Sequence, residues 1–237
     1  MISVHGQQVL IVGGSSGIGL ATAKAAAQGG AHVTIAGRSE AKLELAVQAL
    51  GHGAVGRPLD AGDDKSVADF FADGKTWDHV VATTGAGGRG QIANIAMADA
   101  LAAMNGKFWT YFRIARAAKI ATGGSLTVVS GGLGSKPAPG AALVSAINAA
   151  IEGLTRGLAL DFAPTRVNTV SPGIIDTPLW DRMTAADRQA MYAKATATLP
   201  ARRVGKPEDV GQAILFLMTN PFATGSVLHL DGGSLLL

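Results

Sequence analysis

The chain of 237 residues contains no cysteine, and both aromatic side chains (5%) and charged side chains (16%) are scarce. The absence of cysteine excludes disulfides, thiolate nucleophiles and cysteine-ligated zinc. Because aromatic residues are so few, we expect a core built from Ala, Val, Leu and Ile. A hydrophobic fraction of 48% with little charge excludes a disordered chain, which needs low hydrophobicity and high net charge.

Three further classes of protein are disfavoured by patterns that the sequence does not contain. The formal net charge is only +3 and the longest basic run is Arg202–Arg203, so we expect no nucleic-acid partner. No uninterrupted apolar run reaches the ~18–20 residues that span a bilayer, and residues 1–8 lack the pattern of a signal peptide. No His pair stands at metal-ligand spacing. We therefore expect a cytoplasmic protein without a membrane partner or a metal.

Short β-rich runs alternate along the chain with longer helical runs. This alternation predicts βαβ units and a parallel sheet covered on both faces, in a single α/β domain spanning residues 1–237. A long excursion at 177–199 precedes the last helix. We expect strands at 8–12, 31–36, 54–59, 77–82, 125–129, 166–170 and 226–230, and helices at 18–28, 40–50, 63–73, within 97–121, at 142–163 and at 207–219.

Several of the 32 glycines gather where the first strand meets the first helix. Glycine at such a turn permits positive φ and lets the backbone approach a diphosphate, while the helix N-terminus offers free N–H donors. The spacing G-x3-G-x-G is a variant of the dinucleotide-binding fingerprint. The predicted cofactor-binding residues of this turn are Gly13, Ser15, Ser16, Gly17, Ile18 and Gly19.

The end of the second strand bears on which nicotinamide dinucleotide is bound. An enzyme specific for NAD places a carboxylate there for the ribose 2′-OH, whereas an arginine accommodates a 2′-phosphate. This chain has Arg38 followed by Ser39, with no Asp or Glu at that point. Since arginine can pair with a phosphate bidentately, we predict a preference for NADP(H).

Seven ordered segments of the chain resemble the short-chain dehydrogenase/reductase family. The resemblance implies a Rossmann-type doubly wound sheet, a nicotinamide cofactor, a small-molecule substrate and a homodimer or homotetramer. The segments are VGGSSGIG (12–19), LDAGD (59–63), MNGKFW (104–109), AAIEGLTRGLALDFAP (149–164), RVNTVSPGIIDTP (166–178), GKPEDVGQAILFL (205–217) and TGSVLHLDGG (224–233).

The resemblance also implies cofactor contacts beyond the first turn. It places Asp60 and Ala61 against the adenine and Gly85 at the adenine-ribose side. The nicotinamide would be held by Pro172, Gly173, Ile175 and Thr177. The segment ATTG at 82–85 departs from the family's Asn-Asn-Ala-Gly, so the polar partners that brace the central sheet must differ.

The catalytic residues are where the resemblance fails. It puts Asn148 at the position of the family's lysine, Val144 at that of its tyrosine and Gly131 at that of its serine, and of the four groups only Asn105 is retained. Ser130 precedes the serine position by one residue, which in a regular strand points it to the other side. Because the tyrosine–lysine pair is absent, the candidate catalytic residues are Asn105, Ser130 and Asn148. Asn148 is also a candidate for contact with the cofactor.

Two functions remain open on this reading. The first is an NADP(H)-dependent oxidoreductase that reduces an activated carbonyl, such as a diketone or quinone, whose oxygen needs little help from an acid. The second is a catalytically inactive NADP(H)-binding sensor or partner subunit.

Overall fold

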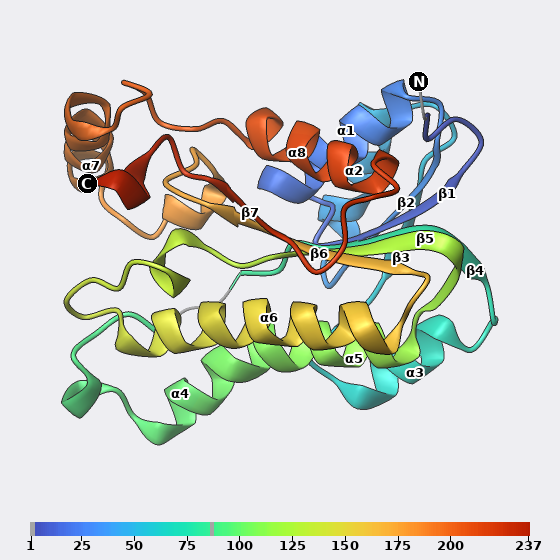
Figure 1. Ribbon diagram of the computed structural model, residues 1–237, viewed down its shortest axis with the longest axis horizontal. Helices are drawn as coiled ribbons and strands as arrows, with labels where there is room; N and C mark the ends of the chain where they lie inside the picture. Colours follow the sequence, from blue (N-terminus) through green and yellow to red (C-terminus); the bar gives the residue numbers. More distant parts are fainter. Residues whose placement is uncertain (1–2, 86–87) are drawn as a thin grey trace.

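The computed structural model describes residues 3–85 and 88–237, which form one α/β layer structure (Figure 1). Its parallel sheet has the strand order β3-β2-β1-β4-β5-β6-β7. The strands are β1 (Gln8–Val12), β2 (His32–Gly37), β3 (Val55–Pro58), β4 (Thr76–Ala82), β5 (Lys119–Val129), β6 (Arg166–Pro172) and β7 (Val227–Leu230). The fold class predicted from the sequence is confirmed, and the order reverses between β1 and β4, the kind of position where open α/β sheets bind ligands.

Helices cover both faces of this sheet. They are α1 (Gly17–Gln28), α2 (Glu40–Leu50), α3 (Asp64–Phe71), α4 (Met97–Met104), α5 (Thr110–Ala117), α6 (Ala142–Asp161), α7 (Ala185–Thr198) and α8 (Pro207–Thr219). In Figure 1, α1, α2 and α8 lie on one side of the sheet and α3 to α6 on the other. Each side has its own cluster of buried apolar residues, and the two clusters are built mainly from Ala, Val, Leu and Ile as expected.

Three segments differ from the pattern expected from the sequence. The strand expected at 125–129 already begins at Lys119, inside the range expected to contain the middle helix. The middle helix ends at Ala117, and between α4 and α5 it contains a five-residue π-helical turn, Asn105–Trp109. Such turns widen a helix locally and are frequent at functional sites. The excursion at 177–199 contains α7, which the sequence reading did not predict although Thr184 caps it by accepting a hydrogen bond from the Asp187 N–H.

The helix α6 is long and apolar enough to cross a membrane by length and composition alone, with a mean hydropathy of 1.2. In the fold it packs on the sheet, and Ile147 and Ile151 are fully buried in the core cluster below it. A core helix of a globular protein passes the same test, so this feature gives no argument for a membrane.

Candidate active site

The glycine-rich turn between β1 and α1 has the close backbone packing that its spacing predicts. Gly13 has φ +84°, and a Cβ on it would lie 2.8 Å from the Thr83 Oγ1. A Cβ on Gly19 would collide with the carbonyl oxygen of Gly13. Thr83 donates through its hydroxyl to the carbonyls of Val12 and Gly13 at 3.2 and 3.3 Å, so it supplies bracing in a loop that lacks the family's asparagines.

The start of α1 leaves donors free for an anion. Ser16 is the N-cap with extended backbone, and its side chain makes no capping hydrogen bond. The first N–H groups of any helix, here those of Gly17, Ile18 and Gly19, have no partner within the helix. A diphosphate placed against this turn would meet N–H donors, the Ser16 hydroxyl and the positive end of the helix dipole.

The turn after β2 lies beside this anion site. Arg38 and Ser39 are both exposed, and Ser39 caps α2 by accepting from the Lys42 N–H at 3.4 Å. A Cβ on Gly37 would lie 3.8 Å from the Ser15 Oγ, so Ser15 borders the Arg38 turn. In the described part of the chain, no carboxylate forms an ion pair with Arg38, which leaves its guanidinium available to a phosphate.

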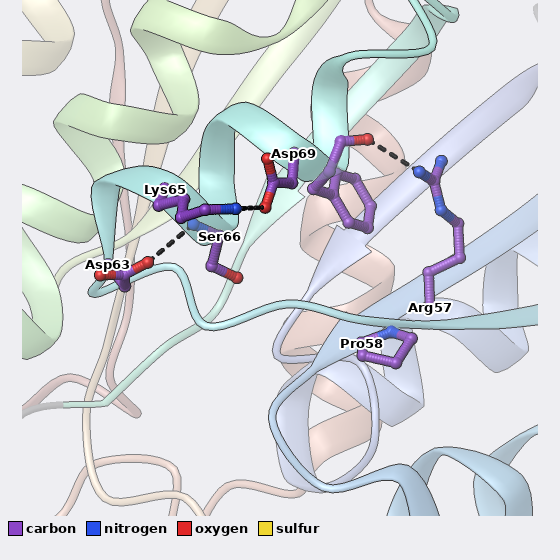
Figure 2. Close-up of a pocket in the computed structure, with 7 residues that line it drawn as sticks. Arg57, Pro58, Asp63, Lys65, Ser66 and Asp69 are labelled. Carbon is purple, nitrogen blue, oxygen red and sulfur yellow. Dashed lines mark hydrogen bonds and ion pairs between the residues drawn. The ribbon is translucent and has the colours of Figure 1, made fainter.

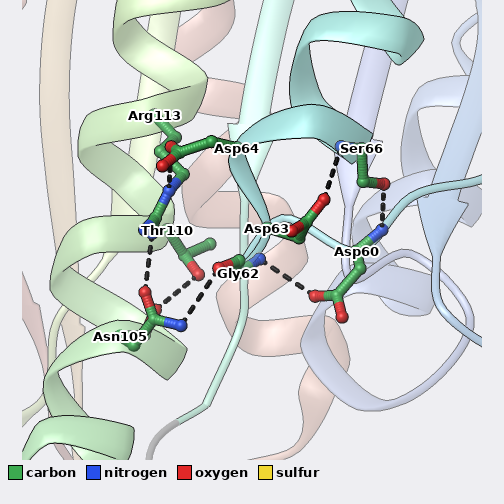
Figure 3. A network of polar contacts seen from close by, with 8 residues as sticks. All are labelled: Asp60, Gly62, Asp63, Asp64, Ser66, Asn105, Thr110 and Arg113. Atoms are coloured by element: carbon green, nitrogen blue, oxygen red, sulfur yellow. Dashed lines mark hydrogen bonds and ion pairs between the residues drawn. The ribbon is translucent and has the colours of Figure 1, made fainter.

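The loop after β3 is bound to the middle helix by a polar network (Figure 3). Asp60 Oδ1 accepts from the Gly62 N–H at 3.0 Å, while the neighbouring Ala61 is buried. The Asn105 amide donates to the Gly62 carbonyl at 3.0 Å and accepts from Arg113 at 2.7 Å. Asn105 therefore braces this loop, and no described hydrogen bond joins it to Ser130 or Asn148.

Figure 2 shows a hollow beside the same loop, with a volume of about 470 Å³. Its charged groups already have polar partners: Arg57 contacts Asp73 at 2.9 Å, and Asp63 accepts from the Ser66 N–H at 2.7 Å. Lys65 contacts Asp69 at 2.6 Å, and the Arg57 guanidinium lies 4.1 Å from the centre of the Phe70 ring. The hollow offers no unpaired group for chemistry.

The segment after β6 meets the glycine-rich turn. A Cβ on Gly173, which follows Pro172, would lie 2.8 Å from the Asp231 Cα, so this position requires glycine. A Cβ on Gly17 would lie 3.4 Å from Thr177, which places Thr177 against the diphosphate turn. The Ile175 carbonyl accepts from the Trp180 indole N–H at 2.8 Å and so fixes the start of the excursion.

The excursion also approaches the loop after β4. A Cβ on Gly85 would lie 3.7 Å from Leu179, which belongs to the short 3₁₀ turn Pro178–Trp180. The Tyr192 hydroxyl on α7 donates to Asp176 at 2.8 Å, and burial together with this carboxylate raises the pKa of Tyr192 to about 12. Tyr192 thus links α7 to the segment that would hold the nicotinamide.

A buried polar chain joins the π-helical turn to α6. Lys107 Nζ donates to the Ser130 carbonyl at 2.6 Å and to Asn148 Oδ1 at 2.8 Å. The Ser130 hydroxyl donates to Glu152 Oε1 at 2.9 Å. All four residues are less than 9% exposed. The structure therefore brings Ser130 and Asn148 together and adds two charged residues that the sequence reading missed.

The electrostatics of this chain centre on Lys107. Burial lowers the pKa of the Lys107 ammonium to about 7, and the nearby Glu152 carboxylate opposes that shift. An amine that titrates near neutral pH inside a site can hold or release a proton under ordinary conditions. In the sequence, the signal for this buried pair was a lone lysine, Lys107, and a lone glutamate, Glu152, each on an otherwise apolar helical face.

Two glycines shape the space beside this chain. A Cβ on Gly131 would lie 3.0 Å from Asn148 Nδ2, and one on Gly134 would lie 3.1 Å from Glu152 Oε1. Val144, one helical turn before Asn148, carries no polar atom on its side chain. The buried Tyr111 hydroxyl is committed to the carbonyls of Thr84 and Val129 at 2.9 and 3.1 Å, so Tyr111 serves packing.

Comparison with known proteins establishes the family. A family model described as enoyl-(acyl carrier protein) reductase matches residues 12–234. The short-chain dehydrogenase/reductase ATR9 of Stachybotrys chlorohalonatus is 33% identical, and the match covers 100% of both chains. The chain belongs to the short-chain dehydrogenase/reductase family and is an oxidoreductase of that family.

Two similar solved structures hold NADPH. A small-chain dehydrogenase in complex with NADPH is 33% identical, with a TM-score of 0.81 over 98% of this chain and 100% of that one. The NADPH-bound short chain oxidoreductase of Pseudomonas aeruginosa PAO1, described as containing an atypical catalytic center, is 26% identical with a TM-score of 0.86 over 97% and 98%. These complexes support a nicotinamide cofactor for this fold.

Proposed function

We propose that this protein is an NADP(H)-dependent reductase of activated carbonyls, such as diketones or quinones, that works without a tyrosine–lysine acid–base pair. The proposal rests on a closely packed glycine-rich turn that suits a dinucleotide and on departures from the catalytic residues that the family resemblance implies. Close packing requires glycine at 13, 19 and 173, while Gly131, Val144 and Asn148 stand where the family resemblance expects Ser, Tyr and Lys.

The residues present fit a dinucleotide with a 2′-phosphate. The turn at 13–19 would hold the diphosphate on backbone N–H groups and the Ser16 hydroxyl. The unpaired Arg38 guanidinium, with Ser39 and Ser15 beside it, would hold the 2′-phosphate. Asp60, Ala61 and Gly85 would border the adenosine. When bound, the cofactor supplies a hydride from its nicotinamide ring.

The segment after β6 would hold the nicotinamide end. Pro172, Gly173, Ile175 and Thr177 lie at or just after the carboxyl end of β6, and Thr177 lies next to the glycine-rich turn. Trp180 and Tyr192 fix the excursion over this region and would help exclude water from it.

An altered reaction site favours substrates that need little acid help. General acid–base catalysis contributes roughly 10²–10⁴-fold, and Val144 supplies none of it. A carbonyl activated by a neighbouring carbonyl accepts a hydride more readily, so positioning beside the cofactor supplies a larger share of the rate. The P. aeruginosa relative with NADPH and an atypical center supports such an arrangement in this family.

The test is NADPH oxidation by 2,3-butanedione and 9,10-phenanthrenequinone, followed by absorbance against a heat-inactivated control. We expect turnover with these acceptors and much slower turnover with a simple ketone. NADPH binding by calorimetry, with no turnover of any acceptor, would favour the alternative of an inactive NADP(H)-binding sensor or partner subunit. Failure to bind either dinucleotide would contradict both functions.

We also propose that the protein works as a homodimer or homotetramer. On the middle helix, Leu101, Trp109 and Phe112 are 61%, 44% and 40% exposed. The chain ends in Leu236 and Leu237, which are also exposed. Contiguous exposed apolar side chains on one helix favour association between subunits.

A further inference from the structure

The lysine of the π-helical turn is held in an unusual place for a cation. Lys107 is 8% exposed, and its ammonium is enclosed by the end of β5 and by α6. Burying a charge is costly unless hydrogen bonds and an opposite charge compensate it. Here the Ser130 carbonyl and the Asn148 amide oxygen accept from it, and Glu152 of α6 is the charged group that acts on it.

This contact fixes how the Asn148 amide is turned. An ammonium can only donate, so the oxygen of the amide must face Lys107 and the NH₂ group must face away. The Nδ2 atom then lies 3.0 Å from the position that a Cβ on Gly131 would take. No hydrogen bond from Nδ2 to another described residue is formed, so this donor is unassigned.

Gly131 leaves the space that this donor fills. Its φ of 166° is extended backbone that any residue adopts, so conformation does not demand glycine there. What glycine provides is room for the Asn148 amide beside the end of β5. By the family resemblance, a serine hydroxyl at 131 would polarise the substrate carbonyl from this point.

Resting on the proposed function, we propose that Asn148 Nδ2 donates the hydrogen bond that stabilises the substrate carbonyl oxygen, and that Lys107 is the positioning residue behind it. The buried charge of Lys107 orients the amide and polarises it, which strengthens the N–H as a donor. Ser130 and Glu152 hold the lysine in turn. In this proposal the Asn148 amide, oriented by the Lys107 ammonium, takes the role that the serine hydroxyl has in the family.

The proposed reduction needs no proton from the site. When bound, the reduced cofactor would supply a hydride to the carbonyl carbon, and the electron pair of the C=O bond would move onto the oxygen. Asn148 Nδ2 stabilises that developing negative charge, as donors of oxyanion holes do. Solvent water then supplies the proton, so an activated carbonyl becomes an alcohol and the reduced cofactor becomes oxidised.

The decisive variant is Asn148→Asp. It keeps an oxygen for Lys107 and nearly the same volume, but it removes the N–H donor. We expect NADPH binding to stay within about fivefold and kcat with 2,3-butanedione to fall about 10²–10³-fold, the usual loss when an oxyanion donor is removed. Asn148→Ala, which also lacks the donor, is the second variant. It should show a similar loss of kcat at unchanged KM.

Lys107→Met tests the positioning role, with Lys119→Met as the matched control. Lys119 is an exposed lysine at the opposite end of β5. We expect Lys107→Met to lower kcat at least tenfold and to flatten its pH profile, a readout that a purely structural lysine would not move. Lys119→Met should behave as the wild type.

The outcomes separate the two proposals. If the wild type oxidises no NADPH with any acceptor, the proposed function is contradicted. If the wild type turns over and folded Asn148→Asp retains kcat within about threefold, the role of Asn148 is overturned while the proposed function stands. If Asn148→Asp loses activity but Lys107→Met keeps both its rate and its pH profile, the positioning role of Lys107 is overturned.

Discussion

Lys107 Nζ lies 2.8 Å from Asn148 Oδ1 and joins the middle helix to α6 where both face the end of β5. The same ammonium donates to the Ser130 carbonyl, whose residue in turn donates through its hydroxyl to Glu152. Lys107, the cation of this hydrogen-bond network, follows Asn105 by two residues on the middle helix. The Asn105 side chain itself donates to the Gly62 carbonyl and so faces that loop (Figure 3). We propose that the reaction site is organised around Lys107 and Asn148.

The first prediction concerns the pH dependence of the free energy of unfolding. Burial lowers the pKa of Lys107 from 10.5 to about 7, so between these values the unfolded state binds more protons than the folded state. The cost of the buried charge is present below pH 7 and is relieved as the pH rises toward 10.5. We expect this contribution to make unfolding harder as pH increases over that window.

Urea unfolding of the wild type and of Lys107→Met across pH 6–10 measures the difference. Lys107→Met should lack the increase, and Lys119→Met should retain it. Parallel curves for the wild type and Lys107→Met would contradict a depressed pKa of Lys107.

The second prediction concerns the cofactor preference. Arg38→Asp removes the guanidinium that would pair with the 2′-phosphate and replaces it with a carboxylate, which repels the negative phosphate. We therefore expect the Kd for NADPH to rise about 10–100-fold. The Kd for NADH should change less than about threefold, because NADH lacks that phosphate. Titration by cofactor fluorescence measures both. Equal weakening of the two would show that Arg38 does not read the 2′-phosphate.

The third prediction concerns restoration of the family's usual groups. The triple variant combines Gly131→Ser, Val144→Tyr and Asn148→Lys. Its new lysine at 148 puts a second amine next to the Lys107 ammonium, and two like charges in a buried site repel. We therefore expect the triple variant to reduce simple ketones poorly. Adding Lys107→Met should relieve the repulsion and raise that activity.

Steady-state assays with a simple ketone compare the triple and quadruple variants. NADPH binding by both variants serves as the control for folding. Equal ketone activity in the two would contradict the proximity of Lys107 to the reacting centre.

The fourth prediction concerns assembly. Trp109 and Phe112 pack edge to face, with ring centroids 5.7 Å apart, and both are exposed on the middle helix. We expect Trp109→Glu/Phe112→Glu to lower the mass measured by light scattering from that of an oligomer toward 23.9 kDa. Phe222→Glu, at a residue 97% exposed after α8, should leave the mass unchanged. A monomeric wild type would contradict the proposed association.

Much of the fold could be predicted from local pattern. The strand at 8–12 is a short apolar run, and Gly19 stands where the turn itself leaves no room for a side chain, because a Cβ there would meet the Gly13 carbonyl oxygen. These features depend on neighbours in sequence or on the strict geometry of one turn. For that reason they are visible without a structure.

The polar contacts of the proposed reaction site could be predicted only in part. Ser130 and Asn148 were candidates, and the structure joins them through Lys107. Lys107 itself was missed because the π-helical turn shifts the register of the middle helix, which a regular period does not anticipate. The contact also depends on tertiary packing between segments 41 residues apart.

The proposed hydride transfer is tested most directly by following deuterium from NADPH, labelled at the reactive C4 position, into 2,3-butanedione. The product is analysed by mass spectrometry. With the wild type we expect an alcohol that carries one deuterium at the reduced carbon, and with Asn148→Asp a rate about 10²–10³-fold lower. Bound NADPH that transfers no deuterium to any activated carbonyl would contradict the proposed reductase.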